Sequence, residues 1–454
     1  MGREAVQQIV ARPDRPHLRV LIRPEERAHP VVRDIIARDL AEIAWGDLID
    51  RQSVAAAVKG CDVVLHVGGL VSPLADNLPP DLVTSVNVGG ARNIVDAIVD
   101  QGQAGTTRLV YIGTVAQTGD RNPPIHWGRT GDPIKVSTFD HYAITKTMAE
   151  AVIAESGIRQ WVSLRQSGMA HFRMWQINDP IMFHNPFNGV FEWSTAADSG
   201  RLMAGFCADQ LPDALWGNFF NIGGGEANRV TNHDFMRRQM PNYEKVLRPH
   251  WFATHNFHGQ WYSDSDRLEE LVPFRGQPLS EFIEDYKRQL PAPVRLVPKV
   301  APWLVKRQLE KMAKGPGGTL NWFATNDEEH IRAYFGSRGE WEAIPRDWEG
   351  FEFSAPSRQP RLLDHGYDET KPRDTWSGAD LQLAAHYRGG KCHAGDGCAP
   401  FEPVGWECCN GHSFTMSPNL MLKGGHWCPT CMLDPAWYAP AASRSPFFAQ
   451  VWQQ

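Results

Sequence analysis

The sequence predicts an α/β protein built on a doubly wound parallel sheet, with a small zinc-binding module near its C-terminus. Two observations predict the sheet: apolar runs of strand length recur between residues 18 and 225, and segments with helical periodicity separate them. A third observation predicts the module, because six of the eight cysteines fall between Cys392 and Cys431.

The predicted strands are short and rich in β-branched residues. They are LRVLI (18–22), DVVLHV (62–67), RLVYIG (108–113) and WVSLR (161–165). Helical patterns cover 54–58, 88–99 and 141–156. Right-handed crossovers then wind the chain on both faces of the sheet and place ligands beyond the carboxyl ends of the strands.

The length of 454 residues exceeds what one compact core holds, so the chain divides into parts. Residues 1–290 form the sheet domain, with its substrate-binding part at about 170–290. Residues 291–385, rich in Trp, Pro, Gly and charge, read as an irregular extension or linker. Residues 386–454 hold the cysteine module and a tail.

Composition restricts the class of partner. The net charge of −6 provides no basic field for nucleic acid, and no run approaches the roughly 20 apolar residues that span a bilayer. The N-terminus MGREAVQQIV lacks the layout of a secretory signal. These features predict a cytoplasmic protein that acts on a small-molecule substrate, with no membrane partner.

Three residues carry the chemistry expected of the sheet domain. Tyr142 and Lys146 are four residues apart at a helix start, so both side chains share one helix face. An ammonium near a phenol lowers the phenol pKa and makes tyrosine an acid or base. Thr114 follows a predicted strand and offers a hydroxyl to a substrate oxygen. The alternatives are a solvated helix face for the pair and a turn-capping role for Thr114.

The order of motifs resembles the extended short-chain dehydrogenase/reductase family of epimerases, dehydratases and 3β-hydroxysteroid dehydrogenases. The resemblance covers roughly residues 2–285. Its motifs are GDLID (46–50), DVVLHVGG (62–69), SVNVGGARNIVDA (85–97), LVYIGTVAQTG (109–119), YAITK (142–146), LRQSGM (164–169) and FFNIGGGE (219–226).

The resemblance implies a Rossmann-like fold and a role for each matching residue. Tyr142 is then the catalytic acid/base, Lys146 its partner that also holds the nicotinamide ribose, and Thr114 the family's Ser/Thr. Asp47 lies near the adenine, and Gly68 and Gly69 let the backbone approach the cofactor. Asn87 matches the asparagine at the next helix start, or caps that helix.

Charge at the tip of the first predicted strand favours NADP over NAD. Arg23 ends LRVLI and Arg27 follows closely, and arginine accommodates a 2′-phosphate. Surface arginines in a turn are the alternative.

The chain departs from the family at its start. The family opens with a strand and a glycine-rich turn at a helix N-terminus. Here Gly2 matches the last glycine of that turn, and the first strand and the other glycines are missing. We expect that the sequence is truncated; the alternative is a protein that lost its main cofactor anchor.

The cysteine cluster predicts a structural zinc site. Cys428 and Cys431 form a C-x-x-C knuckle, and Cys408 and His412 lie about sixteen residues before it. Cys392 is a fifth candidate, because the segment resembles bacterial zinc-ribbon modules. Zinc takes four of these five groups, and their spacing does not decide which. Scattered reduced thiols and a redox-active C-x-x-C are the alternatives.

Two functions follow from these features. The first is an NAD(P)-dependent oxidoreductase or epimerase/dehydratase that transfers hydride to or from a carbonyl or alcohol carbon. The second is a non-catalytic scaffold that senses dinucleotide or binds a protein through its zinc module. The family resemblance also implies a homodimer.

Overall fold

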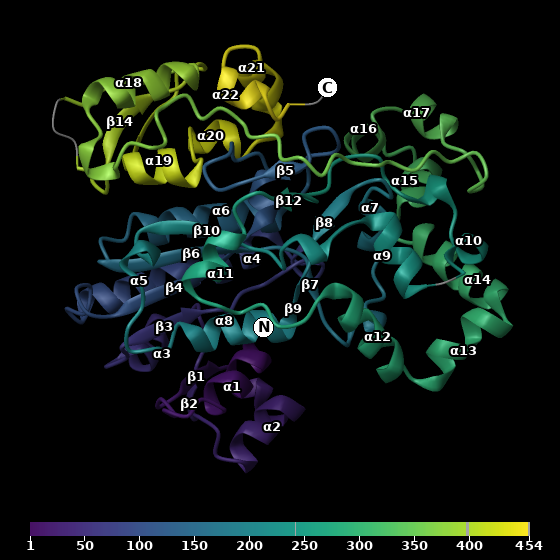
Figure 1. Ribbon diagram of the computed structural model, residues 1–454, viewed down its shortest axis with the longest axis horizontal. Coiled ribbons are helices and arrows are strands. Elements are labelled where there is room, and N and C mark those ends of the chain that lie inside the picture. Colours follow the sequence, from purple (N-terminus) through teal and green to yellow (C-terminus); the bar gives the residue numbers. More distant parts are fainter. Residues whose placement is uncertain (241, 396–398, 453–454) are drawn as a thin grey trace.

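A four-stranded parallel sheet forms the centre of the protein (Figure 1). The computed structural model describes residues 1–240, 242–395 and 399–452. The strand order is β10-β6-β4-β3, with bounds β3 (Val63–His66), β4 (Arg108–Thr114), β6 (Gln160–Gln166) and β10 (Asn218–Ile222). Three of these strands coincide with predicted ones, and β10 lies in the FFNIGGGE motif.

Helices cover both faces of this sheet, which confirms the doubly wound α/β class. Alternate β4 residues point to opposite faces: Leu109 and Tyr111 to one, Val110 and Ile112 to the other. The first face packs against α3 (Arg51–Val58), α5 (Gly90–Asp100) and α6 (His141–Ala154). The second packs against α1 (Gly2–Val10), α8 (Ala196–Gly205) and α11 (Asp266–Leu271).

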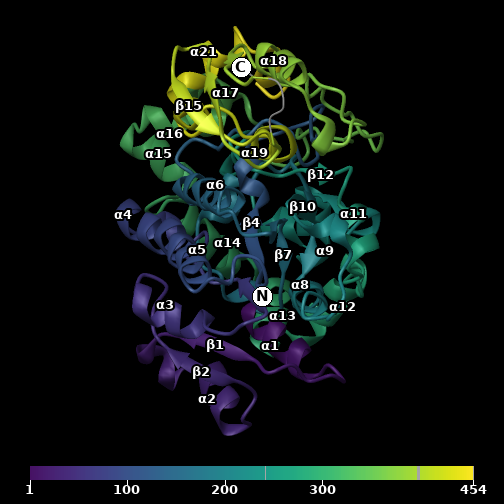
Figure 2. The ribbon, with the colours of Figure 1, turned by 90° about the vertical axis from the view of Figure 1, so that its left-hand side faces the viewer.

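The parallel strands do not form one continuous sheet. Strands β1 (Arg19–Ile22) and β2 (Glu42–Trp45) pair only with each other among the described strands and lie, with α2 (Pro30–Ala37), at one end of the molecule (Figure 2). On its other side β3 pairs with no described strand. The β1-β2 pair and the central sheet are therefore separate, because no described strand joins β1 to β3.

The C-terminal region shares the core on the α6 face. Trp376, Leu381, Trp406 and Met421 pack in the same cluster as residues of α5 and β4. This region lies above the sheet, at the opposite end from β1 and β2 (Figure 1). Its elements are α18 (Gly378–Tyr387), β13 (Lys391–Cys392), β14 (Val404–Glu407), β15 (Ser413–Met416), α19 (Pro418–Gly424), α20 (Pro429–Met432), α21 (Tyr438–Ala442) and α22 (Pro446–Ala449).

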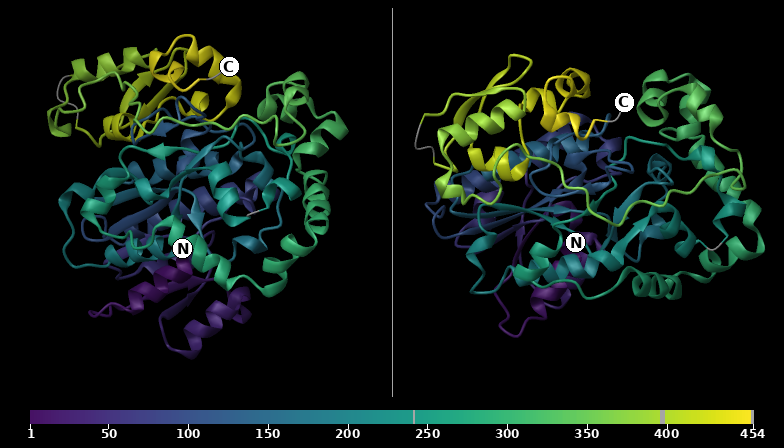
Figure 3. Two further views of the ribbon diagram at one scale, coloured as in Figure 1. Left: turned by 45° about the vertical axis from the view of Figure 1, so that its right-hand side comes forward. Right: turned by 45° about the horizontal axis from the view of Figure 1, so that its top comes forward.

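The first half of the predicted irregular extension is helical. Its helices are α13 (Ala292–Val300), α14 (Pro302–Ala313), α15 (Thr319–Thr325), α16 (Glu328–Phe335) and α17 (Arg338–Ala343), and they flank one side of the sheet (Figure 3). Aromatic packing around the buried Trp322 and Phe335 holds the last three together. Each is only one or two turns long, which is why periodicity did not reveal them.

The remaining helices and strands of residues 80–290 are mostly short. They are α4 (Pro80–Thr84), β5 (Trp127–Gly128), β7 (Met169–Ala170), α7 (Ile181–His184), β8 (Val190–Glu192), β9 (Ser194–Thr195), β11 (Arg229–Thr231), α9 (Asn232–Gln239), α10 (Tyr243–Val246), β12 (Trp261–Tyr262) and α12 (Leu279–Gln289). Within the described residues, no helix combines the length and apolar character that crossing a membrane requires.

Candidate functional site

The structure brings Thr114 and Tyr142 together at the carboxyl end of the sheet. Thr114 is the last residue of β4, and Tyr142 lies in the first turn of α6, where Asp140 accepts a hydrogen bond from the Ala143 amide and caps the helix. The Thr114 side chain lies near enough to the Tyr142 phenol to lower its pKa. Thr114 Oγ1 also accepts from the Ala116 amide at 3.2 Å. Thr114 therefore caps the turn and contacts the tyrosine at once.

The pKa of Tyr142 moves in the opposite direction to the one predicted. Burial raises the Tyr142 pKa above its usual value, while the hydrogen bond with Thr114 lowers it and Asp140 and Asp76 raise it further. The phenol is accordingly the stable form in this structure. The predicted lowering of the Tyr142 pKa required the Lys146 ammonium beside the phenol, but the Lys146 side chain lies over the Tyr111 ring instead.

The Lys146 ammonium lies against an aromatic face. Its Nζ is 4.3 Å from the centroid of the Tyr111 ring. Burial lowers the Lys146 pKa to about 7, although Glu150 raises it. Among the described residues, Lys146 Nζ has no hydrogen-bond or ion-pair partner, an unusual state for a buried cation.

Two residues near Lys146 were not predicted from the sequence. Tyr111 donates its hydroxyl hydrogen bond to the Lys146 carbonyl at 3.1 Å. His66, the last residue of β3, is buried with an unpartnered Nε2, and burial together with Lys146 lowers its pKa to about 3. His66 ends an apolar strand, where polar side chains gather at the carboxyl edge of a parallel sheet, and that position is a signal that could have revealed it. Tyr111 lies in the middle of β4, in register with His66, and the sequence carried no comparable signal for it.

One turn beyond Lys146, the buried Glu150 is the centre of a charged network. Its carboxylate accepts from Arg165 at 2.6 and 3.0 Å and from His426 at 2.8 Å. Gln117 and Ser163 donate to it as well. Arg165 also donates to the Gly424 carbonyl at 2.6 Å. The network therefore joins α6, β6 and the C-terminal region. Spacing gave no signal of the last contact, because His426 is 276 residues from Glu150.

Asn87 fixes the loop that follows β3. It lies in a π-helical turn (Ser85–Gly89) between α4 and α5, so it is not a helix cap. Its Oδ1 accepts from the Leu70 amide at 2.8 Å, and its Nδ2 donates to Thr145 at 3.0 Å. A Cβ on Gly69 would lie 2.9 Å from Asn87 Oδ1, which explains the glycine there. Asn87 thus ties the Gly68–Gly69 loop to α6.

The other predicted cofactor residues, Gly2, Asp47 and Arg23, are distant from Thr114 and Tyr142 in the sequence. The contacts of Asp47 and Arg23 are with residues close to them in the sequence. Gly2 is the first residue of α1, and a Cβ there would meet no atom. Asp47 follows β2 and accepts from the Ile49 amide. Arg23 is exposed and forms ion pairs with Glu25 and Glu26. These two carboxylates compete for the guanidinium that the NADP prediction assigns to a 2′-phosphate.

The structure gathers four of the five predicted metal ligands. Cys408, His412, Cys428 and Cys431 offer ligand atoms that all lie within 4.8 Å of one another. The Cys408–Cys431 sulfurs are 3.8 Å apart, and His412 Nδ1 lies 3.3 to 3.5 Å from the three sulfurs. A tetrahedral zinc with bonds of about 2.3 Å requires sulfur separations of about 3.8 Å. The cluster therefore has the size of a zinc site.

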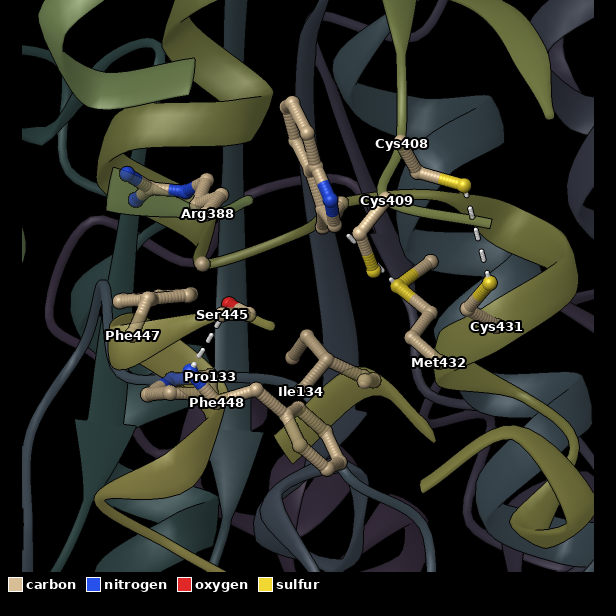
Figure 4. A pocket seen from close by; sticks show the side chains of 13 residues that line it. Pro133, Ile134, Arg388, Cys408, Cys409, Cys431, Met432, Ser445, Phe447 and Phe448 are labelled. Atoms are coloured by element: carbon tan, nitrogen blue, oxygen red, sulfur yellow. Dashed lines mark hydrogen bonds between the residues drawn. The ribbon is translucent and has the colours of Figure 1, made fainter. Parts of the chain in front are cut away.

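Cys392 and Cys409 lie outside this cluster. Cys392 is in β13, where it pairs with Trp406 and its sulfur accepts from the Ala394 amide. The Cys409 side chain points away from the Cys408–Cys431 contact and lines a small cavity with Arg388 and Phe447 (Figure 4). Cys398 lies outside the described residues. Hydrogen bonds from Cys431 lower the Cys428 pKa to about 5, which favours the thiolate that a metal binds.

Comparison with known sequences identifies relatives of the N-terminal region. Residues 1–163 match the model of the 3-beta hydroxysteroid dehydrogenase/isomerase family. The chain is 32% identical over 117 residues to 3 beta-hydroxysteroid dehydrogenase type 7 of Rattus norvegicus, covering 25% of this chain and 33% of the relative. It is 30% identical over 172 residues to the 3 beta-hydroxysteroid dehydrogenase/Delta 5→4-isomerase of Mycobacterium tuberculosis, covering 36% and 44%. The match spans a third to under a half of these proteins.

Solved structures provide two further similarities. A dTDP-glucose 4,6-dehydratase from Streptomyces venezuelae, solved with NAD bound, is 17% identical with a TM-score of 0.49, covering 63% of this chain and 94% of its own. A UDP-glucuronic acid 4-epimerase from Bacillus cereus, in complex with NAD, is 14% identical with a TM-score of 0.49, covering 64% and 96%. The match of residues 1–163 to this family model agrees with the order of the motifs: the N-terminal region is similar to the 3-beta hydroxysteroid dehydrogenase/isomerase family of extended short-chain dehydrogenase/reductases.

Proposed function

We propose that the protein is an NAD(P)-dependent oxidoreductase or epimerase/dehydratase that acts on a secondary alcohol or the matching carbonyl. The observation that carries the proposal is the placement of Thr114 at the carboxyl end of β4 beside Tyr142 in the first turn of α6, with Lys146 one turn along that helix. The relatives' names suggest a 3β-hydroxysteroid as the first substrate to test.

The state of Lys146 supports a dinucleotide beside the tyrosine. A buried ammonium with no described partner except an aromatic face is satisfied by the hydroxyls of a ribose. When bound, the nicotinamide supplies or accepts the hydride. Tyr142 gives or takes the substrate hydroxyl proton, and Thr114 holds the substrate oxygen and orients the phenol.

The preference between NADP and NAD remains a prediction. Glu25 and Glu26 already pair with Arg23, so a 2′-phosphate must displace them. Direct titration with NADPH and NADH, followed by nicotinamide fluorescence, decides between the two. If the chain binds neither dinucleotide, the result favours the second function, a non-catalytic scaffold that binds a protein through its zinc module.

Tyr142→Phe tests the catalytic role. We expect kcat/KM for 3β-hydroxysteroid oxidation to fall by about 10²- to 10⁴-fold, because the variant lacks its proton-transfer group. Binding of NADH and NADPH should stay unchanged. The assay follows formation of reduced nicotinamide by absorbance with wild-type and variant protein.

Tyr286→Phe is the matched control. Tyr286 is a buried tyrosine of α12, outside the site, and its loss should leave kcat/KM unchanged. A Tyr142→Phe variant with wild-type turnover contradicts the assignment of Tyr142 as the acid/base.

A further inference from the structure

A second cavity lies away from the proposed catalytic residues. Its volume is about 740 Å³, within the range of small-molecule sites. Four parts of the chain form its wall: residues 129–130 after β5, the start of β10 with the loop leading into α11, the segment 360–373, and the end of α19. These elements are neighbours in Figure 1, at the junction of the sheet edge and the C-terminal region. Its lining includes neither Thr114, Tyr142 nor Lys146.

Three cations of the lining have no carboxylate partner among the described residues. Arg373 donates to the neutral Gly217 carbonyl and Asn218 Oδ1. Arg267 lies over the Phe220 ring, 5.3 Å from its centroid. Lys423 lies 5.7 Å from the ring centroids of both Tyr367 and Trp376. All three line the same cavity.

The two acidic residues of the lining, Glu369 and Asp264, already accept hydrogen bonds from neighbouring residues. Glu369 accepts two hydrogen bonds from Arg129, at 2.6 and 2.7 Å. Asp264 accepts from the amide and hydroxyl of Thr130 at 2.8 Å and from Asn221 at 3.0 Å. The lining has two further cations: Arg129, which pairs with Glu369, and Lys371, which pairs with Asp380. Arg267, Arg373 and Lys423 together outnumber Asp264, the one carboxylate of the lining that forms no ion pair with a described residue, so the net charge of the cavity is positive.

The response of Lys423 to its surroundings agrees with this field. Burial lowers the Lys423 pKa first, Glu369 raises it, and Arg373, Arg267 and Arg129 lower it further. The cations are thus close enough to destabilise one another, and a bound anion relieves that repulsion.

We propose that this cavity binds a small ligand carrying one or two phosphate groups, held by Arg267, Arg373 and Lys423. Guanidinium groups match phosphate oxygens in a planar fork, and the lysine adds a mobile point charge. The cavity walls come from both the sheet edge and the C-terminal region, so the ligand bridges the two. The site goes beyond the proposed function and does not depend on it.

The test is isothermal titration calorimetry of the full chain with pyrophosphate and, separately, inorganic phosphate. We expect saturable binding of one pyrophosphate per chain, and weakening by about tenfold or more in Arg373→Met and in Lys423→Met. Tyr142→Phe should bind as the wild type does, so a failure of the proposed function stays distinguishable. Zinc content is measured before and after titration, because pyrophosphate also chelates metals.

Matched controls exclude nonspecific charge effects. Arg346 stacks on the Trp341 ring at 4.2 Å, as Arg267 stacks on Phe220, but lies outside the cavity. Arg346→Met should retain wild-type binding, and circular dichroism checks that each variant is folded. The proposal is overturned if pyrophosphate gives no saturable heat with the wild type. It is also overturned if the folded Arg373→Met and Lys423→Met variants bind pyrophosphate as tightly as the wild type does. Tighter binding of inorganic phosphate than pyrophosphate restricts the ligand to a single phosphate group.

Discussion

Cys431→Ser is expected to purify without zinc and to unfold at a markedly lower temperature than the wild type. Metal binding contributes on the order of 10 kcal/mol to small zinc modules, because the unfolded chain holds no preformed site. Here the loss also reaches the sheet, since Trp406 and Met421 of the C-terminal region share its core. The measurements are zinc content by elemental analysis and thermal unfolding by calorimetry.

Cys409→Ser provides the matched control for this prediction. Cys409 is adjacent to Cys408 in the sequence, yet it lies outside the four-residue cluster. Its replacement should retain one zinc per chain. Zinc retained by Cys431→Ser, or lost equally by both variants, contradicts the assignment of Cys408, His412, Cys428 and Cys431 as the ligands.

The second large effect is expected at Glu150. Replacing it by Gln keeps the shape but leaves the buried Arg165 without its carboxylate, and removing one partner of such a pair costs about 3–5 kcal/mol. Urea unfolding at neutral pH measures this loss. Glu328→Gln is the control, because its ion pair with Arg338 is partly exposed and contributes about 1 kcal/mol or less.

The pH dependence of the Glu150→Gln effect has a definite sign. Burial alone raises the Glu150 pKa, but Arg165 and His426 outweigh it and hold it far below the usual value. The stability from Glu150 is therefore complete above about pH 5 and declines as pH falls below about 4, the unfolded pKa. Acid weakens zinc binding in both proteins, so their difference isolates Glu150. A difference that grows on acidification contradicts this account.

Much of the sheet domain was accessible from the sequence. Strands such as Arg108–Thr114 are continuous apolar runs, and buried parallel strands have that signature. The contact of Thr114 with Tyr142 followed from their places at a strand end and a helix start. Five candidate metal ligands followed from knuckle spacing, and the structure gathers four of them. Spacing could not exclude Cys392, because its distance from the others depends on the fold of β13 and β14.

What the sequence did not reveal depends on tertiary burial. The direction of the Tyr142 pKa is decided by desolvation, and the direction of the Lys146 side chain by the Tyr111 ring. The Glu150–His426 contact joins positions 276 residues apart. Local spacing carries no information about any of these.

The core shared between the sheet and the C-terminal region has a consequence for how the chain folds. Lys135 donates to the Val451 carbonyl, 316 residues away, and His426 reaches Glu150 on the central helix α6. A growing chain that already contains every strand of the central sheet still lacks part of the core on one face, the part that Trp376, Leu381, Trp406 and Met421 supply. Contacts of such separation slow folding, and the apolar side chains that await the C-terminal region are prone to aggregation until it packs on them. The C-terminal region thus completes the core of a domain whose strands are all made long before it.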